Sequence, residues 1–468
     1  MNRLFSSAPA FSLLFAGLLL AGCATPTPLD LSSVAATPAA FKEQASSVAA
    51  ATPASGNAVE QGAWWGVFAD PVLNQLVEQA SRSNNSVQVA AGRLLQARAI
   101  ARQTDASRAP QVGLGAGATR QTNASTGNVP ATLVSAGASL SYEVDLFGKL
   151  AGASNAASLD AASREALLRS TRLLVQADVA QTYLSLRALD AERALVNSTL
   201  QAYRNTLRLT EVRFREGDVA ELDVARVRSE VASTESDALA LDRRRAELEH
   251  AVAVLVGEVA STFQIAPVEW ATALPVIPAG VPSSVLVRRP DIAAAQTTLQ
   301  AAQARVGVAR AAWFPSIALT ATGGYAAPEV GDLFKLSMRS WGIGALLSLP
   351  IFDGGRREAG VQGANAELDI ALANYREQIL VAFRDVEDQL SALRLLAEQS
   401  EAQSRSVASS SRATLLSDAR YRNGFVSQLE LLDAQRSELR NRRQALQVKA
   451  AQYLSTVGLI RALGGGWA

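Results

Sequence analysis

The residues that most often carry bond chemistry are scarce in this chain of 468 residues, which contains one cysteine, Cys23, and one histidine, His250. One cysteine cannot form an internal disulfide, and it makes a thiolate zinc site implausible. His250 lies in the helical pattern LEHAVAVLVG, where we expect a packed or exposed helix residue rather than a ligand. Because no catalytic triad, metal cluster or phosphate loop is recognisable either, we expect no enzyme activity and no metal or cofactor site.

Cys23 is instead placed for covalent modification. The first residues, MNRLFSSAPAFSLLFAGLLLAGC, put Arg3 before an apolar run that ends in small residues, which is typical of a signal peptide over residues 1–22. That run is too short to span a bilayer as a mature helix. LAGC, ending at Cys23, resembles the bacterial lipobox, which implies cleavage before Cys23 and attachment of diacylglycerol and an N-acyl chain. The alternative is an ordinary export signal with an incidental cysteine.

The residues after Cys23 indicate where the protein goes. Acyl chains anchor a protein by roughly 0.8 kcal/mol per buried methylene, so several chains on one residue hold firmly. Ala24 stands where aspartate signals inner-membrane retention in lipoproteins, and by that resemblance the protein reaches the outer membrane. Residues 24–57 are rich in Ala, Ser, Thr and Pro and predict a flexible tether. With 44 Lys and Arg against 43 Asp and Glu, we expect no nucleic-acid partner.

A second candidate site is a turn that the chain contains twice. RFREGDVAELDVARVR starts at Arg213 and RYRNGFVSQLELLDAQR starts at Arg420, and each places Arg, an aromatic, Arg, one residue and Gly before an amphipathic pattern. Gly217 and Gly424 permit the positive φ that ends one helix before the next begins. Each copy therefore predicts the tip of a helical hairpin.

The turn belongs to a duplication with an offset of roughly two hundred residues, far longer than the period of a solenoid repeat. QARAIARQ recurs as QARVGVAR, and LSYEVDLFGK recurs loosely as LSLPIFDGGR. Each half is predicted to contain a helix, two strands, a very long helix, the turn and another long helix. The expected organisation is a signal peptide (1–22), a lipidated tether (23–62), a first repeat (63–256), a proline-rich join (257–289) and a second repeat (290–468).

The long helices are predicted to have neighbours on two sides. From about Asn155 to Arg215 the chain has no proline and no glycine, so a helix there would run roughly 90 Å. Its apolar residues form two opposite stripes, whereas a plain two-helix coiled coil needs only one. One stripe is Ala177, Ala180, Leu184, Ala188, Ala191 and Leu195, and the other is Val175, Val179, Tyr183 and Leu186.

Four segments alternate between apolar and small or polar residues, which predicts strands of about ten residues, the length that a tilted strand needs to cross a bilayer. The stretch GLGAGA lacks the strand-then-helix context of a dinucleotide loop. Four strands cannot close, and lipid does not tolerate an open sheet edge, so other copies of the chain are expected to complete the sheet. Two copies would give a filled barrel and three an open lumen. The segments are Val112–Gly117, Val134–Val144, Ser316–Ala321 and Trp341–Leu349.

Eight motifs in order resemble the outer membrane efflux lipoproteins, relatives of OprM and TolC that are often grouped under the name NodT. They are the lipobox, GAWWGVFADPVLNQLV, LSYEVDLFGKL, LVRRPDIAAAQ, ARAAWFPSIALTATGGY, LSLPIFDGGRR, YRNGFVSQLELLDAQR and ALGGGW. The resemblance implies a mixed α and β, TolC-like fold. Each chain of a homotrimer would give four strands to one twelve-stranded outer-membrane barrel, above a long periplasmic α-helical barrel with an α/β collar.

The resemblance also implies a function. Such proteins are exit ducts of tripartite pumps, joined to a periplasmic adaptor and an inner-membrane transporter of the RND type, and they conduct drugs or other small molecules passively. A type I secretion duct and the outer component of a metal-ion efflux system share this architecture and stay open as alternatives. A non-conducting periplasmic coiled-coil lipoprotein is a further alternative, against which the four alternating strands argue.

For the second turn, the resemblance implies that Leu429, Asp433 and Arg436 form the periplasmic aperture of the tunnel. Their spacing of i, i+4 and i+7 puts them on one helix face. Three leucines around a threefold axis would form an apolar constriction, and aspartates paired with arginines would tie neighbouring hairpins together. The alternative for Asp433 and Arg436 is a solvated pair within one helix, worth only a few tenths of a kcal/mol.

The first turn differs at the corresponding positions, which are Leu222, Arg226 and Ser229, so a base replaces the acid. A first hairpin that lies outside the aperture would explain this difference. The outermost residues of both tips are the candidates for contact with the adaptor, and ordinary helix-turn packing is their alternative role. They are Arg213, Gly217, Val219, Arg420, Gly424 and Val426.

Overall fold

The structure is a computed structural model that describes residues 37–43, 63–122, 129–272, 274–278, 280 and 282–466. It divides into two compact units. We call Arg93–Glu165 with Ala294–Glu377 the sheet unit, and Ala36–Gly92 with Ala166–Ala293 and Gln378–Ala468 the hairpin unit. The predicted signal peptide and Cys23 lie outside the described residues. Within those residues, no helix combines the length and hydrophobicity needed to cross a membrane.

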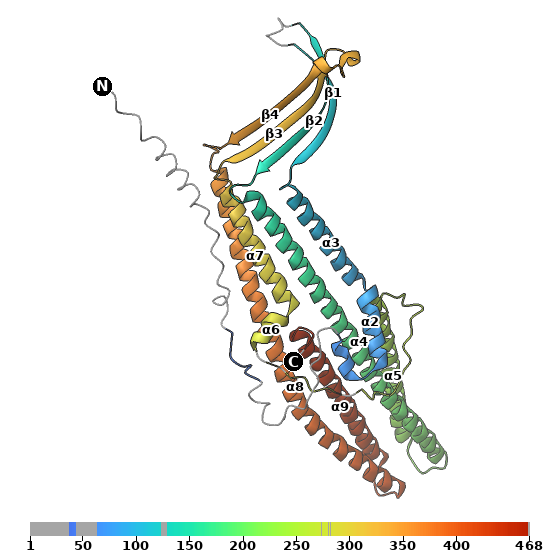
Figure 1. Cartoon of the computed structure of the whole chain (residues 1–468). Coiled ribbons are helices and arrows are strands. Elements are labelled where there is room, and N and C mark those ends of the chain that lie inside the picture. The colour runs from blue at the N-terminus through green and yellow to red at the C-terminus, as the bar shows by residue number, and fades with distance from the viewer. Residues whose placement is uncertain are drawn as a thin grey trace, which may run out of the picture. The chain divides into compact units, whose positions relative to one another are not determined.

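The order of elements follows the predicted order in both halves of the chain (Figure 1). A helical pair, two strands and two long helices occur in the first half, and the same kinds of element follow in the second half after the join. The elements are η2 (Trp64–Phe68), α2 (Pro71–Ser83), α3 (Asn85–Ala106), β1 (Gln111–Gln121), β2 (Ala131–Val144), α4 (Lys149–Arg215), α5 (Glu221–Val256), α6 (Pro282–Arg288), α7 (Pro290–Ala311), β3 (Ser316–Ala327), η4 (Val330–Asp332), η5 (Leu336–Met338), β4 (Arg339–Ser348), α8 (Arg356–Arg422) and α9 (Gln428–Ala462).

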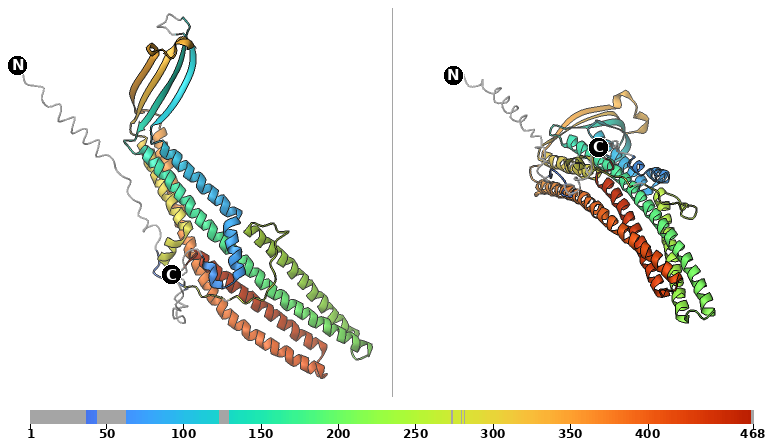
Figure 2. Two further views of the ribbon diagram at one scale, coloured as in Figure 1. Left: turned by 45° about the vertical axis from the view of Figure 1, so that its right-hand side comes forward. Right: turned by 90° about the horizontal axis from the view of Figure 1, so that it is seen from below.

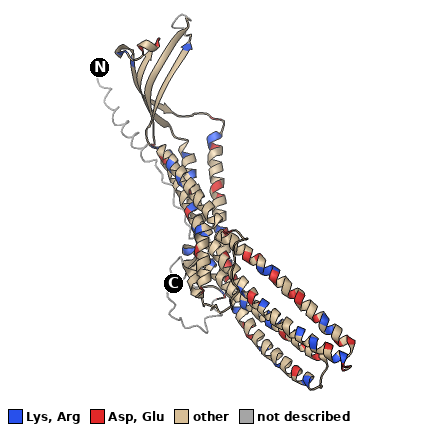
Figure 3. Cartoon of the chain, turned by 90° about the vertical axis from the view of Figure 1, so that its right-hand side faces the viewer, with Lys and Arg blue, Asp and Glu red and all other residues tan. Residues whose placement is uncertain are grey.

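The sheet unit contains one antiparallel sheet in the order β1-β2-β3-β4, which confirms the four predicted strands. Val112 pairs with Leu140, Leu140 with Ala321, and Ala321 with Ile343, so one row of apolar residues crosses all four strands. The two outer side chains of this row, Val112 and Ile343, are 70% and 81% exposed. Charged residues within the strands stand only near the strand ends (Figure 3).

Aspartates start the two long helices at the end of the sheet. The Asp145 carboxylate accepts hydrogen bonds from the backbone N–H groups of Leu150 and Ala151, at 3.2 and 2.7 Å, and so caps α4. Asp353 plays the same part for α8, where it accepts from the N–H groups of Gly355 and Arg357. These caps explain why α4 begins at Lys149, several residues before the predicted start near Asn155.

The hairpin unit contains two antiparallel hairpins, α4 with α5 and α8 with α9, which lie side by side within each pair in both views (Figures 1 and 2). Helices α4 and α8 have the same length, 67 residues each. Both predicted stripes of α4 are largely buried, so the prediction of neighbours on two sides is confirmed. Buried members of the stripes are Val175, Ala177, Val179, Ala180, Tyr183, Leu184 and Leu186.

The segment before α2 completes the packing around α4. Asp70 caps α2, because its Oδ1 accepts from the N–H groups of Val72 and Leu73. Its Oδ2 accepts a hydrogen bond from the Tyr183 hydroxyl of α4 at 2.9 Å. Trp64 is 1% exposed, and its indole N–H donates to the Gln176 side chain of α4 at 3.2 Å. The cap of one helix is therefore also a contact to the next.

Candidate functional site at the hairpin tips

The two hairpin tips close by the same backbone hydrogen bonds. In the first tip the N–H of Gly217 donates to the carbonyl of Phe214 at 3.0 Å, and the N–H of Asp218 donates to that of Arg213 at 2.8 Å. The second tip repeats this pattern, with bonds from Gly424 to Tyr421 and from Phe425 to Arg420 at 3.0 and 2.9 Å. This is the Schellman arrangement, and the φ values of +81° and +74° explain why both positions are glycine.

The first tip packs on the second tip of the same chain. The Arg213 guanidinium lies over the Tyr421 ring, 5.3 Å from its centre. The Tyr421 hydroxyl donates to Gln428 Oε1 at 2.7 Å, and the Thr210 hydroxyl donates to the same oxygen at 3.1 Å. Gln428 is only 4% exposed. The stacking of Arg213 on Tyr421 and the buried bond of Thr210 with Gln428 therefore join the two hairpins, and the sequence pattern alone did not indicate these contacts.

The remaining predicted tip residues are more accessible. Arg420 is exposed, and its guanidinium lies 3.7 Å from the Glu430 carboxylate at the start of α9. Val219 and Val426 are half-buried. Phe425, beside Gly424, is 75% exposed and was not among the predicted contact residues. An exposed aromatic at a helix tip is a frequent anchor for a protein partner, so its type and its place beside the turn were the available signal.

The three predicted aperture residues lie on the first turns of α9. Leu429 is 40% exposed, and the side chain of Asp433 is 62% exposed. The Arg436 guanidinium lies 3.5 Å from Asp433. Its shorter contact is with Glu230 of α5, whose Oε2 accepts from Arg436 Nε at 2.6 Å. The side chain of Glu230 is only 13% exposed, and this hydrogen bond raises the pKa of the Arg436 guanidinium.

Glu230 is the functional candidate that sequence reasoning missed. It follows Ser229, the first-half counterpart of Arg436, but spacing along one helix cannot show a contact between helices that are far apart in sequence. Beside this pair lies a buried apolar cluster of Tyr203, Val227 and Leu432, which joins α4, α5 and α9. Burial raises the pKa of Tyr203 to about 12. Among the described residues its hydroxyl has no hydrogen-bond partner.

A second set of ion pairs joins the hairpins farther from the tips. Arg443 of α9 donates to Glu192 of α4 at 2.7 Å and to Asp237 of α5 at 3.0 Å. Together with the pair of Glu230 and Arg436, this arginine holds α9 against both helices of the first hairpin. These ion pairs have a structural role, because they hold one hairpin on the other through partly exposed charged groups.

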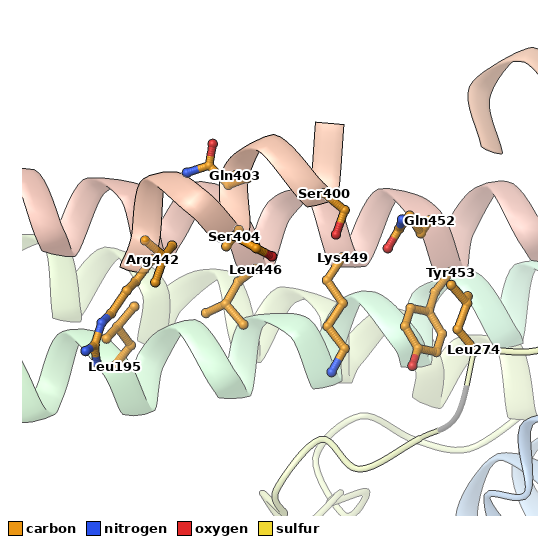
Figure 4. Close-up of a pocket in the computed structure, with 12 residues that line it drawn as sticks. Leu195, Leu274, Ser400, Gln403, Ser404, Arg442, Leu446, Lys449, Gln452 and Tyr453 are labelled. Atoms are coloured by element: carbon orange, nitrogen blue, oxygen red, sulfur yellow. The ribbon is translucent and has the colours of Figure 1, made fainter. Parts of the chain in front are cut away.

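A groove of about 590 Å³ lies beside α9, between α4, α8 and the segment around Leu274 (Figure 4). Its charged residues are Arg442, which is paired with Glu438, and Lys449, whose ammonium lies 4.4 Å from the centre of the Trp270 ring. Leucines and hydroxyl groups form much of the remaining wall. Across the described part of the chain, no group of three or more His, Cys, Asp or Glu residues could hold a metal ion.

A known class of protein combines these features: two duplicated hairpins, a four-stranded sheet, and hairpin tips that contact each other. Residues 76–258 and 281–465 match the outer membrane efflux protein family, and the chain belongs to this family. One relative is OpmQ of Pseudomonas putida, described as a pyoverdine export outer membrane protein, which is 35% identical over 96% of each chain. SilC of Salmonella typhimurium, a probable outer membrane lipoprotein, is 30% identical over 96% of this chain and 97% of its own.

The fold comparison agrees with the sequence comparison. The outer-membrane channel OprN matches with a TM-score of 0.87 and 30% sequence identity, covering 95% of this chain and all of the other. The predicted family, the TolC-like fold and the outer-membrane location are therefore confirmed. The chain is an outer-membrane exit duct for efflux, and its family consists of ducts rather than enzymes.

Proposed function

We propose that three copies of the chain form a sealed duct across the outer membrane, that their second hairpin tips close it at rest, and that the duct is passive. The observation that carries the proposal is the four-stranded sheet, whose outer strands β1 and β4 each pair on one side only. Backbone groups at an open edge have no partner in lipid, so the sheet requires further strands. Three copies give twelve strands and an open lumen.

The seam between β2 and β3 supplies a template for the seam between copies. It joins the last strand of the first half to the first strand of the second half, and there Leu140 pairs with Ala321. Val112 with Leu140 and Ile317 with Leu347 are equivalent pairs in the two halves. If β4 meets β1 of the next copy in the same way, Leu347 pairs with Ala116, and Ala345 pairs with Ala118.

Cysteine cross-linking tests the closure and its register. In the double variant Ala345→Cys with Ala118→Cys, we expect oxidation to give covalent dimers and trimers on a non-reducing gel, because directly opposite Cβ atoms lie about 5 Å apart. Ala345→Cys with Leu114→Cys is the matched control and should cross-link far less. Heat-resistant trimers that cross-link only in the control pair would reject the register alone. A purified monomer without cross-links in either pair would reject closure by copies.

The aperture is proposed at Leu429, Asp433 and Arg436. Leu429 and Asp433 are exposed in one chain, which leaves them available to the copies around the threefold axis. Arg436 is held in place by Glu230, so it can orient Asp433 from a fixed position. In planar bilayers, Asp433→Ala should raise the resting conductance, and unchanged conductance would count against this aperture. Arg226→Ala, at the corresponding place of Asp433 in the first hairpin, is the control.

The partners and the anchor complete the proposal. The lipobox around Cys23 and the likeness to a lipoprotein support acylation of Cys23, and Cys23→Ala should then change gel mobility and membrane association. The tips around Gly217 and Gly424, with the exposed Phe425, support contact with a periplasmic adaptor that links the duct to an inner-membrane RND transporter. Co-purification of an adaptor with the wild-type chain, and its loss with Phe425→Asp, tests this contact.

A further inference from the structure

A short segment of the predicted tether, residues 41–43, is bound to α8. Phe41 is 1% exposed although its neighbourhood in sequence is small and polar, and its ring meets that of Phe383 edge to face, with centres 6.5 Å apart. The expectation of a flexible tether from Ala24 to Asn57 therefore does not hold for this segment. We call residues Phe41, Lys42 and Glu43 the clasp.

Charged hydrogen bonds hold the clasp next to the buried ring. The two carboxylate oxygens of Glu387 accept from the backbone N–H groups of Lys42 and Glu43, at 2.7 and 3.0 Å. The Glu43 carboxylate in turn accepts from the Arg394 guanidinium at 2.9 Å, and this bond raises the pKa of Arg394. Hydrogen bonds with at least one ionised partner are roughly twice as strong as neutral ones.

The duplication shows what the clasp replaces. Helices α4 and α8 have equal length and end in the equivalent tips, so Arg394 of α8 corresponds to Arg187 of α4. Arg187 is paired with Asp190 of its own helix at 3.3 Å. The position that corresponds to Asp190 is Ala397, so Arg394 lacks that acid, and the acid that it meets on its own helix is the exposed Glu398 at 3.5 Å. Glu43 supplies it from the tether.

The duplication also shows which residue takes the place of Trp64 on α8. Gln176 of α4 corresponds to Phe383 of α8, and Gln176 accepts from the indole N–H of Trp64 in the segment before α2. On α8 the equivalent place is covered by Phe41. Thus the chain covers one face of α4 with residues just before α2, and the matching face of α8 with residues nearer to Cys23.

We propose that the clasp is a built-in stop on the lipid tether, which fixes the N-terminal segment to the second long helix. About 18 residues separate Cys23 from Phe41, and they reach at most roughly 60 Å when extended. Without the clasp, the next described residue of the chain is Ala63, about 40 residues after Cys23, a length of chain that reaches at most roughly 130 Å. The clasp thus halves the greatest distance between the lipid on Cys23 and the point where the chain is attached to the helices. This consequence rests on the proposed acylation of Cys23, whereas binding of the clasp to α8 does not.

Trypsin tests the clasp directly, because Lys42 is the one Lys or Arg between Cys23 and Arg82. Its side chain is 88% exposed, but the peptide bond that trypsin would cut carries the N–H bound to Glu387. We expect native protein to resist cleavage after Lys42, and Phe41→Ala or Glu387→Ala to be cut at least about tenfold faster, since cleavage follows the population of the open form. Asp388→Asn, a neighbouring exposed carboxylate, is the matched control and should stay resistant. Equal cleavage of wild type and Phe41→Ala would overturn the clasp.

A shortened tether tests the stop. Deleting residues 27–36 leaves about 8 residues before Phe41, which reach roughly 28 Å, and recovery of heat-resistant oligomer in the outer-membrane fraction should fall about fivefold if the lipid can no longer span its distance. Adding Phe41→Ala and Glu43→Ala should restore recovery, because residues 44–62 then lengthen the tether. Equal recovery of the shortened chain with and without these two substitutions would reject the stop. If the full-length chain itself gave no such oligomer, the proposed duct would fail instead.

Discussion

The two hairpins have the same backbone but differ in where their arginines find acids. In the first hairpin, Arg187 pairs with Asp190, Arg204 with Glu235 and Arg245 with Asp190, so each partner lies in α4 or α5. In the second hairpin, the nearest carboxylates of three arginines lie outside α8 and α9. Arg436 takes Glu230, Arg443 takes Glu192, and Arg394 takes Glu43.

This difference indicates that the first hairpin is a self-contained support and that the second is docked on it. A charge pair within one hairpin stabilises that hairpin wherever it moves, whereas a pair between hairpins is lost when they separate. The second hairpin, which is proposed to carry the aperture, is therefore the one whose position depends on acids from outside α8 and α9. We call these the borrowed acids. Substitutions that remove internal and borrowed acids should separate these two roles.

The largest effect is expected for the internal acid of the first hairpin. Asp190 is buried between Arg187 and Arg245, so Asp190→Ala would leave the buried Arg187 guanidinium without its carboxylate and Arg245 with Glu249 alone, and should destabilise the hairpin unit by about 3–5 kcal/mol. The midpoint of unfolding in guanidinium chloride, followed by far-UV circular dichroism, measures this loss. Glu398→Ala removes a 69% exposed acid from α8 and should cost less than about 1 kcal/mol. Similar losses in both variants would contradict a special role for the buried acid Asp190 in the first hairpin.

The next effect concerns the borrowed acid at the tips. Glu230→Ala removes the partly buried partner of Arg436 and should cost about 1.5–3 kcal/mol, together with a higher resting conductance in planar bilayers. Glu211→Ala breaks an exposed pair with Arg228 inside the first hairpin and is the control. If both variants conduct alike, docking through Glu230 does not set the resting position of the second hairpin.

A third test concerns what the hairpins share. Gly217→Ala and Gly424→Ala each force a side chain into the left-handed region, which costs about 1–2 kcal/mol per residue. Because both turns close with the same two backbone hydrogen bonds, we expect equal losses of stability within a few tenths of a kcal/mol. Unequal losses in the unfolding midpoint would show that the two tips are closed by different means.

The smallest effect is expected at Tyr203, whose hydroxyl is buried without a hydrogen-bond partner in the described structure. Tyr203→Phe removes no bond there and should change stability by less than about 0.5 kcal/mol, or slightly increase it. Burial raises the pKa of Tyr203 to about 12, so its neutral form is favoured and its contribution is lost only as the pH rises from about 10 to 12. In an alkaline titration followed by tyrosine absorbance, the variant should lose one tyrosine that ionises near pH 12. Loss of a tyrosine that ionises near pH 10 would contradict this burial.

Much of this architecture could be predicted because its signals are periodic and local. The alternation of apolar and polar residues predicted the strands, although β2 extends three residues before Val134. The repeated glycines predicted both turns. The contact of Arg436 with Glu230 could not be read in this way, since helical spacing shows which residues share a face but not which distant helix that face meets. The clasp was hidden for another reason. A single aromatic and a single lysine in an Ala, Ser and Pro background carry too little pattern to outweigh the composition.

The pairing of β2 with β3 has a consequence for how the protein is made. The whole first hairpin lies between these strands in sequence, so their hydrogen bonds close a very long loop. Because the N-terminal half is exported first, β1 and β2 form a two-stranded ribbon in which the edge of β2 that pairs with β3 stays unpaired until β3 arrives. Such a ribbon is prone to stick to other chains during export, so periplasmic chaperones that shield nascent strands should be needed until the second half arrives.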